Sequence, residues 1–450
     1  MLGNELDDYK KLHWIQKKLR NEEKVVFIKS VAKCGKGLIT VNHQRAVALL
    51  ANKKTAKFAG VTTCKSPWCC PVCTSRKMAQ YAEEISVAID ALKDRSMAAA
   101  MLTFTIPHTS GFSCEQVTNI LHKVWKAFTV HGNKQHGTAK NDIFSNCMQA
   151  LQSKHRVRVT EYTYGNAGWH PHIHALFWAP VKLLNNFLDW EERLQKRWIE
   201  LCKRYTIQEI LIGYPETQRK TVRAQVITRI NIMYNNLNDD SKCVYVSKVK
   251  HLGKVEVIKQ ESSGYICGWG ANREVTGNYK EKASNPNHYT WQQILENAIN
   301  EDNELQPAAG ARKKEVRVGR GTGSGWWELF LEYAVTTRKC AKRRVQWSVH
   351  SGIKQIIADY KKTAAYKNIV RKNTLKLRET FGVWKTVCWF DVEQWNKVCF
   401  YELQTTILEL ATANDALKKI TELFERYRIK PPIINEAAGA KIAAIYNNAA

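Results

Sequence analysis

The chain has 450 residues, 44% of them hydrophobic, and these values are typical of a globular protein with two or three well-packed domains. It contains no apolar run of about 18 residues that would cross a membrane and no apolar signal-peptide centre, so we expect a cytoplasmic protein. Its 69 Lys and Arg against 41 Asp and Glu give a net charge of +28, which favours nucleic acid as partner, then an anionic membrane surface, over a merely solvated basic surface.

A cysteine cluster marks the N-terminal part of the chain. Cys70-Pro-Val-Cys73 has the CxxC spacing that lets two thiolates reach one ion, and Cys34 and Cys64 can complete a four-thiolate structural zinc site. Cys69 adjoins Cys70 and points elsewhere. The alternatives are a redox CxxC pair, which usually lies in a βα context that is absent here, or unrelated buried thiols.

The segments that follow alternate between helical and strand patterns. In chain order they predict a helix over 75–94, a buried strand over 98–107, an amphipathic helix around 117–125 and a short helix over 142–152. Residues 156–164 (RVRVTEYTY) have strand composition, and the turn at 165–168 returns the chain as a second strand. We expect these two strands to pair antiparallel.

The second strand of this hairpin, GWHPHIHALFWAP over 168–180, carries the strongest chemical signal. Alternate side chains of a strand share a face, so His170, His172 and His174 project to one side and apolar residues to the other. Neutral imidazole is a strong ligand for divalent metals and a poor core filler, which predicts a metal site. A wet strand face with hydrogen-bonded histidines is the alternative. Glu161 lies close across the ladder, where a carboxylate ligand would be wanted.

Beyond the hairpin the pattern predicts a helix over 181–205, strands over 222–234 and 242–249, and a helix over 250–269. Strands and helices alternate irregularly, and the hairpin makes part of the sheet antiparallel. The expected fold class is therefore α+β rather than a doubly wound parallel sheet.

Half of the excess positive charge lies between residues 312 and 385, which hold nineteen Lys or Arg and five Asp or Glu. Cationic groups interleaved with indole rings predict phosphate contacts and stacking platforms for DNA, and a solvated helix face is the alternative. The predicted DNA-binding residues are Lys313, Lys314, Lys342, Arg343, Arg344, Trp326 and Trp347.

Four stretches carry a family resemblance in their order and spacing. They are the cysteine cluster with Trp68, residues 102–108 (LTFTIPH), residues 161–174, and residues 264–269 (GYICGW) followed by Trp291. Together they resemble the HUH-superfamily replication initiators of rolling-circle plasmids, in the branch with an N-terminal cysteine cluster.

The resemblance implies an α+β fold in which an HUH endonuclease core, a central antiparallel sheet flanked by helices, follows a small zinc module. We expect residues 1–80 to form the lead-in and zinc module, 81–300 the nuclease core, and 310–450 a basic, mainly helical DNA-binding region. A prokaryotic host is also implied.

The implied activity is site-specific nicking of single-stranded origin DNA. Mg²⁺ or Mn²⁺ would be bound by His172 and His174, with Glu161 as the third ligand and His170 as the alternate. The metal would polarise the scissile phosphate. Host helicase and polymerase are the expected partners.

Tyr265 is the implied nucleophile, and its attack would leave a 5′-phosphotyrosine and a free 3′-hydroxyl primer. Glu261, one helical turn earlier, is a candidate general base in a hydrolytic or second transesterification step, and a solvated carboxylate is the alternative. The family has Tyr-x-x-Lys where this chain has Gly268. The cations that could replace the lysine are Lys248, Lys250 and Arg273.

Two other readings stay open at this point. Another HUH enzyme, a relaxase or a single-strand transposase, would use the same residues. A non-enzymatic, zinc-dependent DNA-binding regulator would account for the cysteines and the charge but would leave the histidines without a role.

Overall fold

The computed structural model describes residues 5–22, 25–41, 44–93, 95–129, 143–184, 188–235, 244–246, 288–304, 325–340, 344–348 and 352–433. The chain divides into two compact units, Met1–Ala79 with Lys362–Ala450, and Gln80–Lys361. Within the described ranges no helix is both long enough and apolar enough to span a membrane. The α+β class is confirmed, because antiparallel sheets and helices make up both units.

The first unit combines segments from both ends of the chain. Its N-terminal elements are α1 (Glu5–Lys18), the 3-10 helix η1 (Leu19–Asn21), α2 (Val25–Ala32), β1 (Thr40–Val41), β2 (Gln44–Arg45), β3 (Val47–Ala51), β4 (Ala56–Ala59) and the start of α3 (Pro71–Lys93). Its C-terminal elements are α13 (Ala364–Phe381), β11 (Lys385–Phe390), α14 (Val392–Phe400), α15 (Gln404–Leu410) and α16 (Ala416–Arg426).

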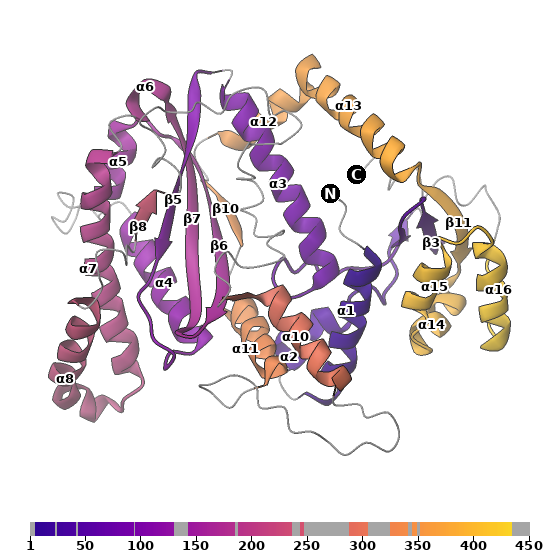
Figure 1. Cartoon of the computed structure of the whole chain (residues 1–450), viewed down its shortest axis with the longest axis horizontal. Coiled ribbons are helices and arrows are strands. Elements are labelled where there is room, and N and C mark those ends of the chain that lie inside the picture. Colours follow the sequence, from indigo (N-terminus) through magenta and orange to yellow (C-terminus); the bar gives the residue numbers. More distant parts are fainter. Residues whose placement is uncertain are drawn as a thin grey trace. The chain divides into compact units, whose positions relative to one another are not determined.

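A three-stranded antiparallel sheet in the order β11-β3-β4 joins these two segments. Every residue of the central strand β3 is buried, as expected of an apolar strand (VALLA) covered on both faces. Phe58 of β4 lies 4.8 Å from Trp395 of α14, between ring centroids, and forms part of the core. Helices α14, α15 and α16 lie beside β11 (Figure 1). We expected three consecutive segments, and the pairing of β11 with β3 instead brings residues after 362 into the N-terminal unit.

The second unit is built on a six-stranded antiparallel sheet in the order β10-β6-β7-β5-β8, with β9 paired to β6. Its strands are β5 (Met97–Thr105), β6 (His155–Gly165), β7 (Gly168–Pro180), β8 (Val244–Val246), β9 (Tyr289–Thr290) and β10 (Val345–Trp347). Its helices, besides the end of α3, are α4 (Cys114–Thr129), α5 (Ile143–Ala150), α6 (Val181–Leu184), α7 (Leu188–Ile212), α8 (Glu216–Asn235), α10 (Trp291–Glu304), α11 (Trp326–Lys339) and α12 (Ile353–Lys362).

One face of this sheet is an aromatic core. Phe104 of β5 lies 4.8 Å from Trp198 of α7 and 5.3 Å from Phe128 of α4, between ring centroids. Both helices lie along the same face of β5 and β7 (Figure 1). The expected apolar stripe of α4, which includes Val117 and Leu121, is fully buried against it.

The predicted hairpin is confirmed. Strands β6 and β7 pair antiparallel from His155 opposite Trp178 to Gly165 opposite Gly168. Gly168 has a φ of +88°, a conformation that side chains rarely adopt, and a Cβ there would lie 3.1 Å from the Cα of Ser110. The turn therefore requires glycine at this position.

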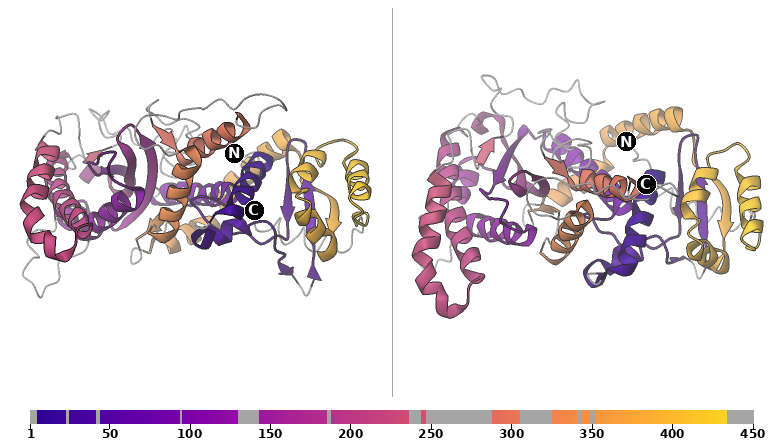
Figure 2. Two further views of the ribbon diagram at one scale, coloured as in Figure 1. Left: turned by 90° about the horizontal axis from the view of Figure 1, so that it is seen from below. Right: turned by 60° about the horizontal axis from the view of Figure 1, so that its bottom comes forward.

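One predicted strand was wrong. Residues 222–234 lie in helix α8, which forms a helical hairpin with α7 (Figure 2). Their β-branched residues favour a strand by composition, but Val226 and Ile230, four positions apart, are the buried pair on one helical face. Packing against α7 overrides local propensity here. The helix predicted over 250–269 lies outside the described residues.

Replacing Gly168 by Ala should lower the free energy of unfolding by about 2 kcal/mol, because the left-handed backbone and the contact with Ser110 both oppose a Cβ. Gly352→Ala is the matched control, since its φ is +67° but no atom lies within 4 Å of the added Cβ. It should cost about 1 kcal/mol. Urea unfolding measures both losses, and equal losses would refute the role given to the close contact.

Candidate metal centres

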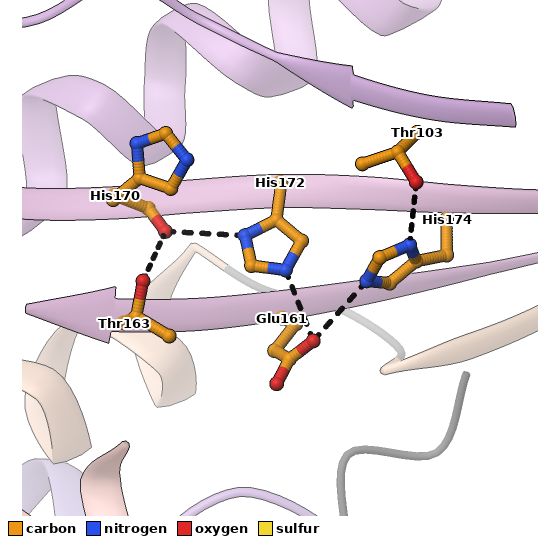
Figure 3. A network of polar contacts seen from close by, with 6 residues as sticks. All are labelled: Thr103, Glu161, Thr163, His170, His172 and His174. Atoms are coloured by element: carbon orange, nitrogen blue, oxygen red, sulfur yellow. Dashed lines mark hydrogen bonds and ion pairs between the residues drawn. The ribbon is translucent and has the colours of Figure 1, made fainter. Parts of the chain in front are cut away.

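The first candidate metal centre is a buried carboxylate between two imidazoles on the β6–β7 hairpin (Figure 3). The register places Glu161 opposite His172, and the two-residue period of β7 places His174 next on the same face. Glu161 Oε2 lies 3.0 Å from His172 Nε2 and 3.2 Å from His174 Nε2. The group that we predicted from alternation and hairpin pairing is therefore brought together.

The electrostatics of this group suit a cation. Burial acts to raise the pKa of the Glu161 carboxyl, but the hydrogen bonds from His172 and His174 outweigh it and hold that pKa well below its usual range. Ligands at right angles around an ion with bonds of about 2.1 Å lie about 3.0 Å apart. The observed Nε2–Oε2 distances match that separation, so the three side chains could bind a divalent metal ion.

Contacts to the second ring nitrogen orient the imidazoles of His172 and His174. Thr103 Oγ1 lies 2.9 Å from His174 Nδ1, and the carbonyl oxygen of His170 lies 3.4 Å from His172 Nδ1 (Figure 3). Such contacts to the second ring nitrogen direct the first nitrogen toward a metal. Thr103 comes from β5, opposite His174 in the β5–β7 ladder.

The His170 ring, the alternate ligand of our prediction, is not a member of the three-residue group. It lies 5.0 Å from the ring of His108 and 5.9 Å from that of His288, between centroids. Burial, followed by the charge of His172, holds the pKa of His170 well below its usual value. The structure thus adds a row of imidazoles beside the centre, formed by His170, His108 and His288. His288 was not predicted, because no local pattern links it to β7.

Helix α11 is tied to the turn end of the histidine strand. Glu332 accepts a hydrogen bond from the indole of Trp169 at 2.9 Å and another from the backbone N–H of Cys114, at the start of α4, at 2.8 Å. The Trp169 ring also stacks on Tyr333 with centroids 5.9 Å apart. These contacts fix the strand that carries the ligands, and Glu332 was not predicted as a site residue.

The second candidate centre is the predicted cysteine quartet, which the first unit brings together. The Sγ atom of Cys73 lies 3.6 Å from that of Cys34 and 3.5 Å from that of Cys64, and Cys70 Sγ lies 3.7 Å from Cys34 Sγ. Four thiolates around one tetrahedral ion with 2.3 Å bonds are about 3.8 Å apart. The group could therefore bind a metal ion.

Backbone geometry explains how these cysteines meet. Gly35 N–H donates to Thr62 O and Thr62 N–H donates to Gly37 O, both at 2.8 Å, so the segments that carry Cys34 and Cys64 run side by side. Cys70 and Cys73 lie at the start of α3, where Thr74 N–H donates to Cys70 O at 2.8 Å.

The protons of the quartet are shared unequally. Hydrogen bonds from Cys34 and then from Cys64 lower the pKa of Cys73, whereas burial raises the pKa of Cys70. Cys69, predicted as the spare, lies outside the quartet with its Sγ 3.8 Å from Ser66 Oγ. A cation would favour the thiolate form of all four ligands.

The residues predicted to bind DNA differ in how far they are buried. Trp326 is half-buried against Tyr289, with ring centroids 4.9 Å apart. Trp347 is buried and stacks on Trp178, and Arg344 is 3% exposed. These two are interior residues in the structure, in contrast to the surface role predicted for them. The remaining predicted residues, Lys313, Lys314, Lys342 and Arg343, lie outside the described residues, as do Tyr265 and Glu261.

Comparison with known proteins gives one partial similarity. A neomycin resistance protein from Streptomyces cyanogenus is 29% identical over 133 residues, which are 26% of this chain and 30% of that protein. The chain thus matches less than a third of that relative's length. No protein-family model matches the chain, and no solved structure matches it.

Cys73→Ser should remove a bound metal ion from the purified protein and lower its free energy of unfolding by about 4 kcal/mol, because metal binding stabilises the folded unit. Elemental analysis by mass spectrometry measures the metal content. Cys69→Ser, an adjacent buried thiol outside the quartet, is the control and should keep the ion. Equal metal content in both variants would contradict the assignment.

Thr103→Val should weaken divalent-metal binding at the Glu161 centre by about tenfold or more, because His174 loses its orienting contact. Thr160→Val removes a buried hydroxyl from the opposite face of β6 that has no hydrogen-bond partner among the described residues. That control should leave the affinity unchanged in a Mn²⁺ titration by calorimetry. Similar affinities for the two variants would show that Thr103 does not orient the ligand.

Proposed function

We propose that this protein is a rolling-circle replication initiator of the HUH class, which nicks single-stranded origin DNA by metal-assisted tyrosine transesterification. The observation that carries the proposal is the Glu161, His172 and His174 group, buried on one face of an antiparallel hairpin. A buried carboxylate with two imidazole partners at 3.0 and 3.2 Å could bind a divalent cation. The family resemblance implies that this cation is Mg²⁺ or Mn²⁺.

When bound, such a cation would polarise the scissile phosphate and stabilise the charge that grows on its oxygens. The chain's own residues position that chemistry. His172 and His174 present their Nε2 atoms on one side of the sheet, and Glu161 supplies the compensating negative charge. The contact of Thr103 Oγ1 with His174 Nδ1 fixes the orientation of the His174 ring.

Tyr265 is the proposed nucleophile on the strength of its motif, since it lies outside the described residues. A bond forms between its phenolic oxygen and phosphorus, and the bond from phosphorus to the 3′ oxygen breaks. The phenolic proton passes to solvent, and the 3′ oxygen takes up a proton. Glu261 is the candidate general base for a later hydrolytic or second transesterification step. The products are a 5′-phosphotyrosine and a 3′-hydroxyl that a polymerase can extend after a helicase opens the duplex.

Other parts of the chain support this function. The net charge of +28 favours a polyanionic substrate. The cysteine quartet fits structural Zn²⁺, because four thiolates at tetrahedral spacing leave no open position for a substrate. It would stabilise the N-terminal module.

A relaxase or a single-strand transposase would use the same centre and differ in the DNA that it recognises. A zinc-dependent DNA-binding regulator would not need a buried carboxylate between two imidazoles. Cleavage of DNA therefore distinguishes the replication initiator from the regulator. The sequence of the DNA that is cut distinguishes the initiator from a relaxase or a transposase.

Incubation with labelled single-stranded origin DNA and Mn²⁺ should give a covalent adduct on a denaturing gel, and Tyr265→Phe should abolish it. Combining His172→Ala with His174→Ala should lower the rate of cleavage by at least about a thousandfold and leave DNA binding intact. Only the chemical step depends on the charge stabilisation that the metal would provide.

An adduct that persists in the Tyr265 variant would refute that residue as nucleophile. If the wild-type chain binds origin DNA and never cleaves it with either metal, the regulator is the better assignment.

A further inference from the structure

A cavity of about 960 Å³ lies in the second unit, between β6, β10, α4 and α5. Arg156 and Arg158 of β6 line it. Because alternate side chains of a strand point to opposite faces, these two arginines lie on the face opposite Glu161. The cavity is therefore on the face of the sheet opposite the candidate metal centre. Its volume is within the usual range of small-molecule sites.

The walls of this cavity are positively charged. Lys154, Arg156 and Arg158 contribute three cationic groups, and no Asp or Glu is among the described residues that line it. Arg158 Nε is buried and has no hydrogen-bond partner among the described residues. Burial lowers the pKa of Arg158 to about 10. An anionic ligand would provide the missing partner.

Aromatic rings lie directly beside these cations. The Arg158 guanidinium is 5.5 Å from the ring centre of Trp125, and that of Arg156 is 5.4 Å from the ring centre of Phe144. Gln346, which is opposite Arg158 in the β10–β6 ladder, is exposed at the rim. The rings are 9% exposed in Trp125 and 3% exposed in Phe144, so they form an apolar wall of the cavity and not an open stacking face. Guanidinium forks recognise a phosphate, an apolar wall contacts a base, and an amide binds the polar edge of that base.

We propose that this cavity binds a nucleoside phosphate, with Arg156 and Arg158 on the phosphate and the Trp125 and Phe144 wall beside the base. An inorganic phosphate would fill only a small part of the volume and would leave the aromatic wall unused. The ligand is either a free nucleotide or one nucleotide of a single strand. The site does not depend on the nicking activity proposed above, because it shares no residue with the metal centre.

The test measures binding to the full-length chain by two probes, radiolabelled thymidine monophosphate in equilibrium dialysis and a short fluorescein-labelled oligothymidylate by anisotropy. The pocket variant combines Arg156→Gln with Arg158→Gln. The control variant combines Arg223→Gln with Arg229→Gln, which removes the same charge from exposed positions of α8. The pocket variant should bind one or both probes at least tenfold more weakly than the control.

Loss of mononucleotide binding assigns the site to a free nucleotide, and loss of oligonucleotide binding alone assigns it to a nucleotide within a strand. Equal affinities of the pocket and control variants for both probes would overturn the proposal. So would inorganic phosphate that displaces the mononucleotide at equal concentration, since the base would then contribute nothing.

A crosslinking measurement covers the case in which the pocket variant does not fold. An oligothymidylate that carries 5-iododeoxyuridine is irradiated on the wild-type chain, and the crosslinked peptides are mapped. Crosslinks should fall on peptides that contain Trp125 or Phe144, and crosslinks confined to other peptides would overturn the proposal. The chain with both His172 and His174 replaced by Ala should give the same map, so failure of nicking and failure of this site are distinguishable.

Discussion

The antiparallel register of β6 and β7 is the constraint on which the candidate metal centre depends. A slip of one residue would turn Glu161 to the aromatic face of the sheet while His172 and His174 stayed on the polar face. The glycine at 168, which the tight approach of Ser110 requires, sets this register at the turn. Glu332 holds the same end from outside through the Trp169 indole.

Pro171 shows how closely the strand is fitted to its neighbours. Proline cannot donate a backbone hydrogen bond and is usually excluded from central strands. Strand β5 ends at Thr105, opposite His172, so Pro171 lies one position beyond the β5 pairing. Among the strands that the structure describes, only β6 pairs with β7 at that point, and the missing N–H is tolerated between the histidines.

The two faces of this sheet have opposite energetic roles. The aromatic face contributes apolar burial, with Phe104 and Trp198 both fully buried. The other face buries a carboxylate that is 4% exposed, and removing an ion from water costs several kcal/mol unless partners compensate. His172 and His174 supply that compensation through their contacts with Glu161. The apolar face thus stabilises a sheet whose other face holds these three side chains together.

The sequence alone allowed the prediction of features that depend on local periodicity. The alternation of the histidines, the turn at 165–168 and the CxxC spacing identified the three side chains of one group and the four thiols of the other. Thr103 could not be found in this way, because its contact with His174 depends on a pairing of β5 with β7 across 71 positions. The helix at α8 was missed because β-branched composition does not reveal which residues a neighbouring helix will bury.

The composition of the first unit has a consequence for synthesis on the ribosome. Its sheet is completed only when β11 pairs with β3, and the Trp395 indole contacts Lys36 O across 359 positions. At ordinary elongation rates this separation corresponds to roughly 20 to 70 s of translation, during which an apolar strand edge waits for its partner. All four cysteines of the quartet, the last of them at position 73, emerge early in that interval. An early metal crosslink between Cys34, Cys64 and the start of α3 would hold the nascent N-terminal segment compact until the C-terminal strand arrives.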